Sequence, residues 1–236
     1  MTLRALLLAA GIGLRLRPFT EKTPKCLMKI GGRPLLSYWL ESLAVAGIKK
    51  ILINTHHLPD QIVSFISTSP YRSIVSLVHE PELEGTAGTL RKNISFFDSE
   101  DGLLIHADNF CAEGIQNFCS AHLNRPKNCV MTMMAFRTKH PERCGILKID
   151  QNNVVTNFFE KEQYANNGNL ANGAIYALSA KFIDNFDSTF DLVSDFSTEV
   201  IPKFMGQIFT YETKNFFIDI GTPESYAEAN NFHSTL

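Results

Sequence analysis

The sequence has no surplus of basic residues. Its 236 residues include 22 Lys and Arg against 24 Asp and Glu, for a formal net charge of -2. Because a nucleic-acid-binding surface needs basic residues to neutralise phosphates, this balance argues against nucleic acid as a main partner. Basic residues are nevertheless concentrated near the N-terminus, which indicates a local anion site. They are Arg4, Arg15, Arg17, Lys22, Lys25, Lys29 and Arg33.

Long apolar runs and paired cysteine motifs are also missing. The mostly apolar stretch 3–10 is too short to span a membrane and has no signal-peptide cleavage pattern, so we expect no membrane partner. The five cysteines are odd in number and form no Cys-x-x-Cys pair. We therefore expect a reduced, cytoplasmic protein without a cysteine metal site.

No repeat or low-complexity linker divides the chain, and 44% of its residues are hydrophobic, enough for one large domain with a real core. Residues 1–136 alternate apolar strands with amphipathic helices. This alternation is typical of an α/β fold with a Rossmann-like, mostly parallel sheet flanked by helices. Residues 137–236 contain shorter elements, including a hairpin turn at 151–153, a strand at 174–178 and a helix at 198–204. They predict a smaller mixed α/β region. We therefore predict a single domain over 1–236 with these two halves.

The first predicted strand, Leu3–Leu8, opens into a loop that is suited to binding a phosphate chain. Ligands of parallel sheets bind beyond the carboxyl ends of the strands. Small residues let backbone N–H groups approach an anion there, and cations neutralise it. We predict that this loop is the catalytic centre. Its small residues and cations are Ala9, Ala10, Gly11, Gly13, Arg15, Arg17 and Lys25.

A Gly-x-Gly sequence after a strand also suggests a dinucleotide-binding fingerprint. The third glycine of that fingerprint would stand at position 16, which is Leu16. The acidic residue expected after the second strand is replaced by Asn54. Both departures disfavour a nicotinamide or flavin site.

The longer motif is more specific. Gly11-x-Gly13-x-Arg15-Leu16-x-Pro18-x-Thr20, followed by Pro24-Lys25 and Gly32-x-Pro34-Leu35-Leu36, resembles the sugar-1-phosphate nucleotidyltransferase family. Members join a nucleoside triphosphate to a sugar 1-phosphate and release pyrophosphate. The resemblance covers essentially the whole chain. It departs at Leu14, where the family usually has Thr or Ser.

Two aspartates stand where predicted strands end. Asp108 follows the apolar run 103–107, and Asp219 follows 216–218. A carboxylate at the carboxyl end of a sheet is placed to hold Mg²⁺. The resemblance implies that Asp108 and Asp219 share one Mg²⁺ ion, and that Asp108 is catalytic together with Arg15 and Lys25.

Residues 80–89 predict a strand end, a turn and a helix that begins with a Thr cap. The resemblance implies that this stretch reads the base, and its Gly-Thr-Ala sequence is similar to guanylyltransferases that act on mannose- and heptose-type phosphates. The residues expected to bind nucleotide are Ala9, Ala10, Gly11, Gly13, Arg15, Lys25, Glu80, Gly85, Thr86 and Asp108.

The sugar phosphate is expected to bind mainly to the second half of the chain. Glu160-Lys161 resembles the family's Glu-Lys pair, and the stretch 172–176 resembles its Asn-x-Gly-Ile-Tyr strand, with Ala174 in place of the usual second Gly. The residues expected to bind the sugar phosphate are Asn109, Gly145, Glu160, Lys161, Asn172 and Asp219.

The base and the acceptor stay open. A uridylyl-, cytidylyl- or thymidylyltransferase acting on another phosphate is an alternative to a guanylyltransferase, and so is a nucleotide-sugar-binding homologue without turnover. A homo-oligomer is compatible with the sequence. The chain ends soon after the last predicted helix, at 223–232, so we expect no C-terminal β-helix of the kind found in longer relatives.

Overall fold

The computed structural model describes residues 3–160, 167–190 and 192–234, which form two compact units. The elements belong to the mixed α/β class predicted from the sequence, a large and mostly parallel sheet flanked by helices. The first unit comprises Met1–Leu83, Ile105–Ile115 and Asn215–Leu236, and the second comprises Glu84–Leu104 and Gln116–Lys214. Along the chain, β6 (Gly102–His106) runs from the second unit into the first.

The first unit is built on three parallel strands, β1 (Arg4–Leu8), β4 (Ile51–Thr55) and β5 (Val75–His79). Leu8 lies opposite Asn54 in the register of β1 and β4. Because the strands run in the same direction, residues that follow each of them meet at one edge of the sheet. The anion-binding loop predicted after β1 therefore leaves from this edge.

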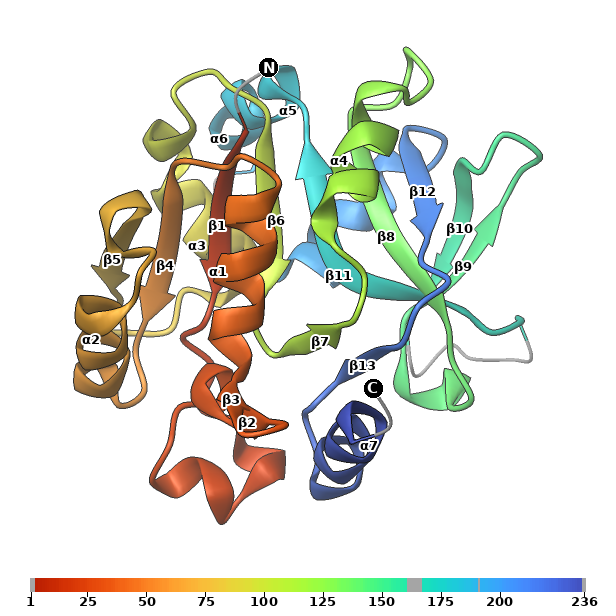
Figure 1. The fold of residues 1–236 in the computed structure, drawn as a ribbon. Helices are drawn as coiled ribbons and strands as arrows, with labels where there is room; N and C mark the ends of the chain where they lie inside the picture. Colours follow the sequence, from red (N-terminus) through yellow and green to blue (C-terminus); the bar gives the residue numbers. More distant parts are fainter. Residues whose placement is uncertain (1–2, 161–166, 191, 235–236) are drawn as a thin grey trace. The chain divides into compact units, whose positions relative to one another are not determined.

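The helices of the first unit agree with the sequence periodicity. They are α1 (Leu35–Val45), α2 (Pro59–Thr68) and α7 (Pro223–His233). In Figure 1, α1 lies in front of β1. Its side chains spaced by three and four residues, Leu36, Trp39, Leu40 and Leu43, are buried. At the start of α7, Thr222 and Ser225 form a reciprocal capping box that fixes the first turn.

Four short strands complete the first unit: β2 (Lys29–Ile30), β3 (Arg33–Pro34), β7 (Asn109–Cys111) and β13 (Phe217–Asp219). The first pair forms a hairpin, and the second forms an antiparallel ladder. Of these four strands, only β13 was predicted. The other three were missed because strands of two or three residues are too short to show a period of two. Three 3₁₀ helices, η1 (Leu14–Leu16), η2 (Phe19–Glu21) and η3 (Lys25–Leu27), shape the loop after β1.

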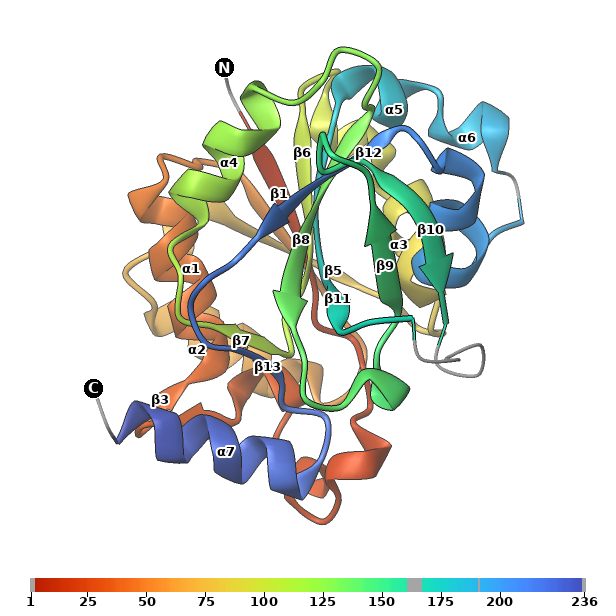
Figure 2. The ribbon, with the colours of Figure 1, turned by 90° about the vertical axis from the view of Figure 1, so that its right-hand side faces the viewer.

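In the second unit, β8 (Met131–Arg137) pairs with two neighbours. One is β11 (Leu170–Leu178), which is antiparallel, and the other is β12 (Ile208–Glu212), which is parallel. In turn, β11 pairs with the hairpin of β9 (Ile146–Ile149) and β10 (Val155–Phe159), which faces the viewer in Figure 2. The hairpin turn predicted at 151–153 is confirmed.

The strand predicted at 174–178 begins earlier, at Leu170, and the helix predicted at 198–204 is divided. A π-helical turn, η8 (Phe196–Val200), is followed by a 3₁₀ helix, η9 (Ile201–Phe204), because Pro202 cannot donate a helical hydrogen bond. The other helices of the second unit are α3 (Gly85–Lys92), α4 (Ile115–Leu123, whose first residue belongs to the first unit), α5 (Ala180–Asp184) and α6 (Phe186–Thr189). Further 3₁₀ helices among the described residues are η4 (Arg72–Ile74), η5 (Ile94–Phe97) and η6 (Pro141–Arg143).

No helix in the described ranges is both long enough and apolar enough to cross a membrane. All five cysteines are free thiols. Cys26 and Cys129 are buried, whereas the other three are half-buried. Burial raises the pKa of the Cys26 thiol to about 12, so this thiol stays protonated at neutral pH.

A buried polar cluster lies inside the second unit, around His122 of α4. The His122 side chain is fully buried, with Nε2 3.2 Å from Asp101 Oδ2 and Nδ1 2.8 Å from Thr132 Oγ1. Burial lowers the pKa of His122, against the opposing effect of its hydrogen bond to Asp101. Burial raises the pKa of Asp101, but hydrogen bonds from His122 and from the Ala180 N–H bring it below its ordinary value. The native cluster therefore contains a neutral imidazole and a carboxylate.

This cluster predicts a loss of stability on acidification. On acidification, the imidazole of the unfolded chain takes up a proton near pH 6.5, whereas His122 in the folded protein stays neutral. Because this proton binds only to the unfolded chain, the free energy of unfolding falls by up to about 1.4 kcal/mol for each unit by which the pH is lowered. Urea unfolding at pH 7, 6 and 5 measures this slope. His122→Gln should flatten it, because the amide does not titrate and can still donate to Asp101. The exposed control His140→Gln should keep the wild-type slope, and equal slopes in all three proteins would contradict the assignment.

Candidate active site

Lys25 joins the two predicted strand-end aspartates within the first unit. Its Nζ atom donates to Asp108 Oδ2 at 2.6 Å and to Asp219 Oδ1 at 2.9 Å. The Lys25 side chain is only 9% exposed, although it carries a charge. Arg15 lies on the open side of this group, 66% exposed, with Nη2 3.6 Å from Asp219 Oδ2. Four predicted site residues thus form one charged cluster.

The ladder between β7 and β13 brings the aspartates together. Asp219 is the last residue of β13 and pairs with Asn109, the first residue of β7, which directly follows Asp108. The ladder continues into a hydrogen bond from the Ile220 N–H to the Asp108 carbonyl, 3.2 Å long. In addition, Trp39 Nε1 of α1 donates to the Asn109 carbonyl at 2.9 Å. Two carboxylates that are distant in the sequence become neighbours through backbone pairing.

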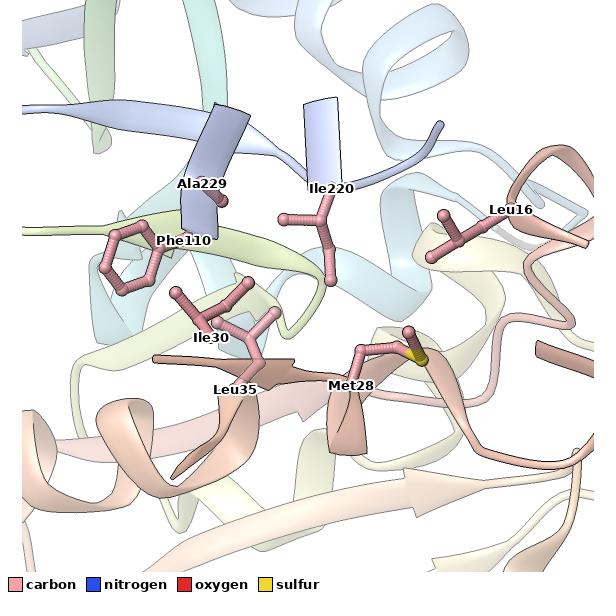
Figure 3. Close-up of a cluster of buried hydrophobic side chains, with 7 residues drawn as sticks. All are labelled: Leu16, Met28, Ile30, Leu35, Phe110, Ile220 and Ala229. Atoms are coloured by element: carbon pink, nitrogen blue, oxygen red, sulfur yellow. The ribbon is translucent and has the colours of Figure 1, made fainter. Parts of the chain in front are cut away.

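An apolar cluster supports the charged residues (Figure 3). Leu16 follows Arg15, Phe110 follows Asn109, and Ile220 follows Asp219 in the sequence, and all three side chains are buried in this cluster. The apolar residue of each pair is held in the cluster, so the backbone that carries its polar neighbour is fixed. The other members are Met28, Ile30, Leu35 and Ala229.

The charges of the cluster stabilise one another. Burial lowers the pKa of Lys25, but Asp108 and Asp219 outweigh it and raise the pKa above its ordinary value. Burial raises the pKa of Asp108, but the positive charge of Lys25 and the electrostatic effect of His106 bring it below its ordinary value. The ammonium and the carboxylate therefore both stay charged at neutral pH.

The donor set of this cluster fits a divalent cation. Oxygen atoms from two carboxylates already converge on a single positive centre, the Lys25 ammonium, as they would on a metal ion. In the described part of the chain, no group of three or more His, Cys, Asp or Glu residues could hold a metal. A metal on Asp108 and Asp219 would thus take its remaining ligands from phosphate and water, as Mg²⁺ commonly does.

The loop after β1 is fixed at its start and near its middle. Ala9 and Ala10 are buried, and the Ala9 N–H donates to Asn54 Oδ1 at 2.6 Å. Gly13 has a left-handed backbone, with φ 68°, and its carbonyl accepts from Thr20 Oγ1 at 2.8 Å. A Cβ atom at Gly13 would lie 2.8 Å from the Thr20 side chain. The loop therefore needs glycine at this position for its shape.

Glu80 stands directly after β5 and is only 6% exposed. Its N–H donates to the Thr55 carbonyl at 2.8 Å, and its Oε1 accepts from Asn54 Nδ2 at 3.0 Å. From the sequence, Asn54 served only to disfavour a dinucleotide site, and these contacts were not predicted. The signal that could have found them is a lone amide side chain near the end of an otherwise apolar strand.

Two of the predicted nucleotide contacts, Gly85 and Thr86, lie in the second unit. Gly85 has φ 73°, and a Cβ atom there would lie 2.3 Å from the Ser194 carbonyl oxygen. Thr86 was expected to cap α3, but the helix begins at Gly85, so Thr86 is inside its first turn. Its Oγ1 accepts instead from the Phe196 N–H at 2.7 Å. Thr86 thus ties α3 to the π-helical turn, and the predicted cap is wrong.

Three of the predicted sugar-phosphate residues also lie in the second unit. A Cβ atom at Gly145 would lie 2.6 Å from the Phe158 ring and 3.7 Å from Glu160 Oε1. The side chain of Asn172 accepts from the Ala174 N–H and donates to the Tyr176 hydroxyl, both at 2.8 Å. Gly145 and Glu160 are therefore neighbours, and Asn172 is oriented from both ends of its amide. Lys161 lies outside the described residues.

Comparison with known families finds a match over nearly the whole chain. A family model described as "Nucleotidyl transferase" matches residues 4–235. The chain belongs to the nucleotidyl transferase family. This result confirms the family resemblance predicted from the sequence motifs.

Several relatives of this nucleotidyl transferase family member are named for one activity. The mannose-1-phosphate guanylyltransferase catalytic subunit beta of Drosophila melanogaster is 29% identical over 229 residues, covering 94% of this chain and 60% of the relative. The mannose-1-phosphate guanyltransferase of Yarrowia lipolytica is 24% identical over 230 residues, with 95% and 62% covered. The chain thus spans only about three fifths of the length of these relatives.

Solved structures share the fold over nearly the whole chain. HddC from Yersinia pseudotuberculosis, solved in complex with GMP-PN, is 27% identical with a TM-score of 0.79, and 98% of this chain and 99% of HddC are covered. A second structure of HddC is 28% identical with a TM-score of 0.80 over the same shares of both chains.

One departure from the family motif predicts a gain in stability. Ala174 has φ 51°, in the left-handed region, where the register between β11 and β8 shifts. The left-handed conformation destabilises the folded state by roughly 1–2 kcal/mol when the residue has a Cβ atom. Glycine avoids this strain, but it lowers the free energy of unfolding by roughly 0.4–1 kcal/mol because it increases the entropy of the unfolded chain. Ala174→Gly should therefore raise the free energy of unfolding by about 0.5–1 kcal/mol in urea titrations.

The matched control is Ala177→Gly in the regular part of β11, where Ala177 pairs with Thr132. There the same change should lower the free energy of unfolding by about 0.5–1 kcal/mol, because glycine gains nothing from its freedom. Equal destabilisation by both changes would show that the backbone at Ala174 carries no strain.

Proposed function

We propose that this chain transfers a nucleotidyl group from a nucleoside triphosphate, GTP by preference, to a mannose- or heptose-type sugar 1-phosphate. The observation that carries the proposal is the cluster in which Lys25 bridges Asp108 and Asp219 with Arg15 beside them. We assign the nucleotide to residues 1–136 and the sugar phosphate mainly to residues 137–236. The names of the relatives from Drosophila melanogaster and Yarrowia lipolytica support this choice of substrates.

In the proposed reaction, an oxygen of the sugar phosphate forms a bond to the α-phosphorus of the triphosphate. The bond from that phosphorus to the bridging oxygen breaks, and pyrophosphate leaves with the electron pair. The attacking phosphate is already an anion near pH 7, so no general base is needed. Arg15 can bind the departing phosphates through its guanidinium fork, and Lys25 supplies a point charge near the reacting phosphate.

Asp108 and Asp219 are the residues proposed to hold Mg²⁺. A bound Mg²⁺ would neutralise phosphate charge and help to align the two substrates. The two carboxylates themselves keep Lys25 charged and orient its ammonium, as the hydrogen bonds of 2.6 and 2.9 Å indicate. Their role toward Lys25 therefore supports the chemistry independently of the metal.

The preference for guanine rests on the chemistry of Glu80. An ionised carboxylate only accepts hydrogen bonds, and guanine presents N1–H and N2–H donors side by side on one edge. Uracil, thymine and cytosine present mixed donors and acceptors on that edge. The complex of HddC with GMP-PN also supports a guanine nucleotide.

The proposal predicts pyrophosphate release when the protein is mixed with GTP, Mg²⁺ and mannose 1-phosphate. Asp108→Asn should reduce the rate about 100-fold or more, since removing one group that stabilises transition-state charge costs roughly 3–4 kcal/mol. The control Asp187→Asn alters an exposed carboxylate at the start of α6 and should leave the rate unchanged. The readout is a coupled pyrophosphate assay.

Two outcomes would contradict this reading. If Asp108→Asn keeps turnover within a few-fold of wild type, the assignment of Asp108 is wrong. If a broad panel of triphosphates and sugar phosphates binds without any turnover, the chain is a binding homologue rather than an enzyme.

A second prediction concerns the competition between Lys25 and a metal. The Lys25 ammonium lies between the carboxylates that we assign to the metal, so it opposes metal binding when no nucleotide is present. A unit charge about 4 Å away acts with roughly 4 kcal/mol at an effective dielectric constant near 20. Lys25→Met should thus bind Mn²⁺ at least about tenfold more tightly than wild type without nucleotide, although it loses activity.

Electron paramagnetic resonance titration of free Mn²⁺ measures this affinity directly. Lys29→Met is the matched control, because Lys29 is an exposed cation of the same unit. Its Mn²⁺ affinity should equal that of wild type. An unchanged or weaker affinity in a folded Lys25→Met protein would show that Lys25 does not compete with the metal.

A further inference from the structure

Asn54 is a buried amide at the carboxyl edge of the sheet formed by β1, β4 and β5. It is 2% exposed and lies in register with Leu8 of β1 and Val78 of β5. Its side chain bonds to the first residue after each neighbouring strand, Ala9 on one side and Glu80 on the other. One side chain therefore connects the ends of three strands.

The orientation of the Asn54 amide follows from its partners. The Ala9 N–H can only donate, so the atom 2.6 Å from it is the oxygen, Oδ1. The Nδ2 group must then face Glu80 Oε1, which accepts at 3.0 Å. A carboxylate needs a donor at this distance, so both contacts require the same orientation. Rotating the amide would place a donor against a donor and an acceptor against a carboxylate.

Two histidines that follow Asn54 also contact Glu80 and the loop after β1. His56 Nδ1 donates to the Glu80 carbonyl at 2.8 Å, and His57 Nε2 donates to the Thr20 carbonyl at 2.7 Å. Both ring nitrogens are donors because a carbonyl oxygen can only accept. Since Thr20 in turn binds the Gly13 carbonyl, the turn 54–57 contacts the β1 loop at two points.

We propose that Asn54 is a positioning residue that couples phosphate binding to base selection. It holds the start of the loop after β1, which we assign to phosphate binding, through Ala9. With the other end of the same amide it fixes the plane of the Glu80 carboxylate. The inference rests on the proposed function, in which Ala9 belongs to the phosphate loop and Glu80 reads the base. Asn54 acts through these two residues, because its own amide is engaged by both.

Three variants separate the two ends of the amide. Asn54→Leu removes both hydrogen bonds. Asn54→Asp keeps an acceptor for the Ala9 N–H but places a second carboxylate against Glu80. In the double variant Asn54→Asp with Glu80→Gln, the amide at position 80 can donate to the carboxylate at position 54. The hydrogen bond between these positions is restored in the reverse direction, but the carboxylate at position 80 is not.

The test measures the dissociation constants of GTP, UTP and inorganic tripolyphosphate by calorimetry, together with the melting temperature. Asn54→Leu should weaken tripolyphosphate binding about tenfold, because the Ala9 N–H loses its buried acceptor and the loop shifts. Asn54→Asp should reduce the preference for GTP over UTP about tenfold. The added charge affects both nucleotides equally, so it cancels in this ratio. The double variant should recover the melting temperature but not the preference.

Asn230→Leu is the matched control. Asn230 also lies in the first unit and uses both ends of its amide, accepting from the Gly31 N–H at 3.1 Å and donating to the Tyr226 carbonyl at 3.0 Å. This change should lower the melting temperature while leaving tripolyphosphate affinity and the GTP-to-UTP ratio unchanged.

A purely structural Asn54 would give a different result. Folded Asn54 variants would then melt at lower temperature but keep wild-type tripolyphosphate affinity and base preference, which would overturn the proposal. If wild type binds tripolyphosphate without preferring GTP, the guanine assignment fails by itself. The tripolyphosphate affinity of Asn54→Leu then still decides whether Asn54 positions the phosphate loop.

Discussion

The burial of a charged ammonium at Lys25 is the constraint on which the arrangement of the first unit depends. A buried charge is strongly destabilising unless carboxylates and hydrogen bonds compensate for it. Asp108 and Asp219 supply both, at 2.6 and 2.9 Å. They can do so only if β13, from the end of the chain, pairs with β7 directly after Asp108. The ion pair thus makes the last segment of the chain part of the site built on the first.

The same constraint explains why an apolar cluster lies beneath the charged residues. Desolvated charges hold their geometry only when the backbone that carries them is fixed, and the cluster fixes it through Leu16, Phe110 and Ile220. Each of these side chains directly follows a polar residue of the site region in the sequence. Packing and electrostatics therefore act on the same short segments, and neither would place the carboxylates without the other.

The sequence was sufficient for features that are encoded locally. Strands and helices of five or more residues were predicted within a few residues, and the strand-end positions of Asp108 and Asp219 pointed to the cluster. The sequence was not sufficient where tertiary pairing decides. β7 is too short to show periodicity, and the contacts of Asn54 depend on the register of three strands. Thr86 looked like a cap because a partner 110 residues away, the Phe196 N–H, is invisible to local rules.

The loop between β1 and η3 combines fixed ends with exposed side chains between them. Asn54 holds it at Ala9 and the carboxylates hold it at Lys25, whereas Leu14 is 59% exposed and Arg15 is 66% exposed at its side chain. This exposure bears on the replacement of the usual Thr or Ser by Leu14. An exposed side chain on a loop with fixed ends contributes little to stability, so the missing hydroxyl does not weaken the fold. Backbone N–H groups and the Arg15 charge do not depend on that side chain, and we infer that phosphate binding at this loop rests on them.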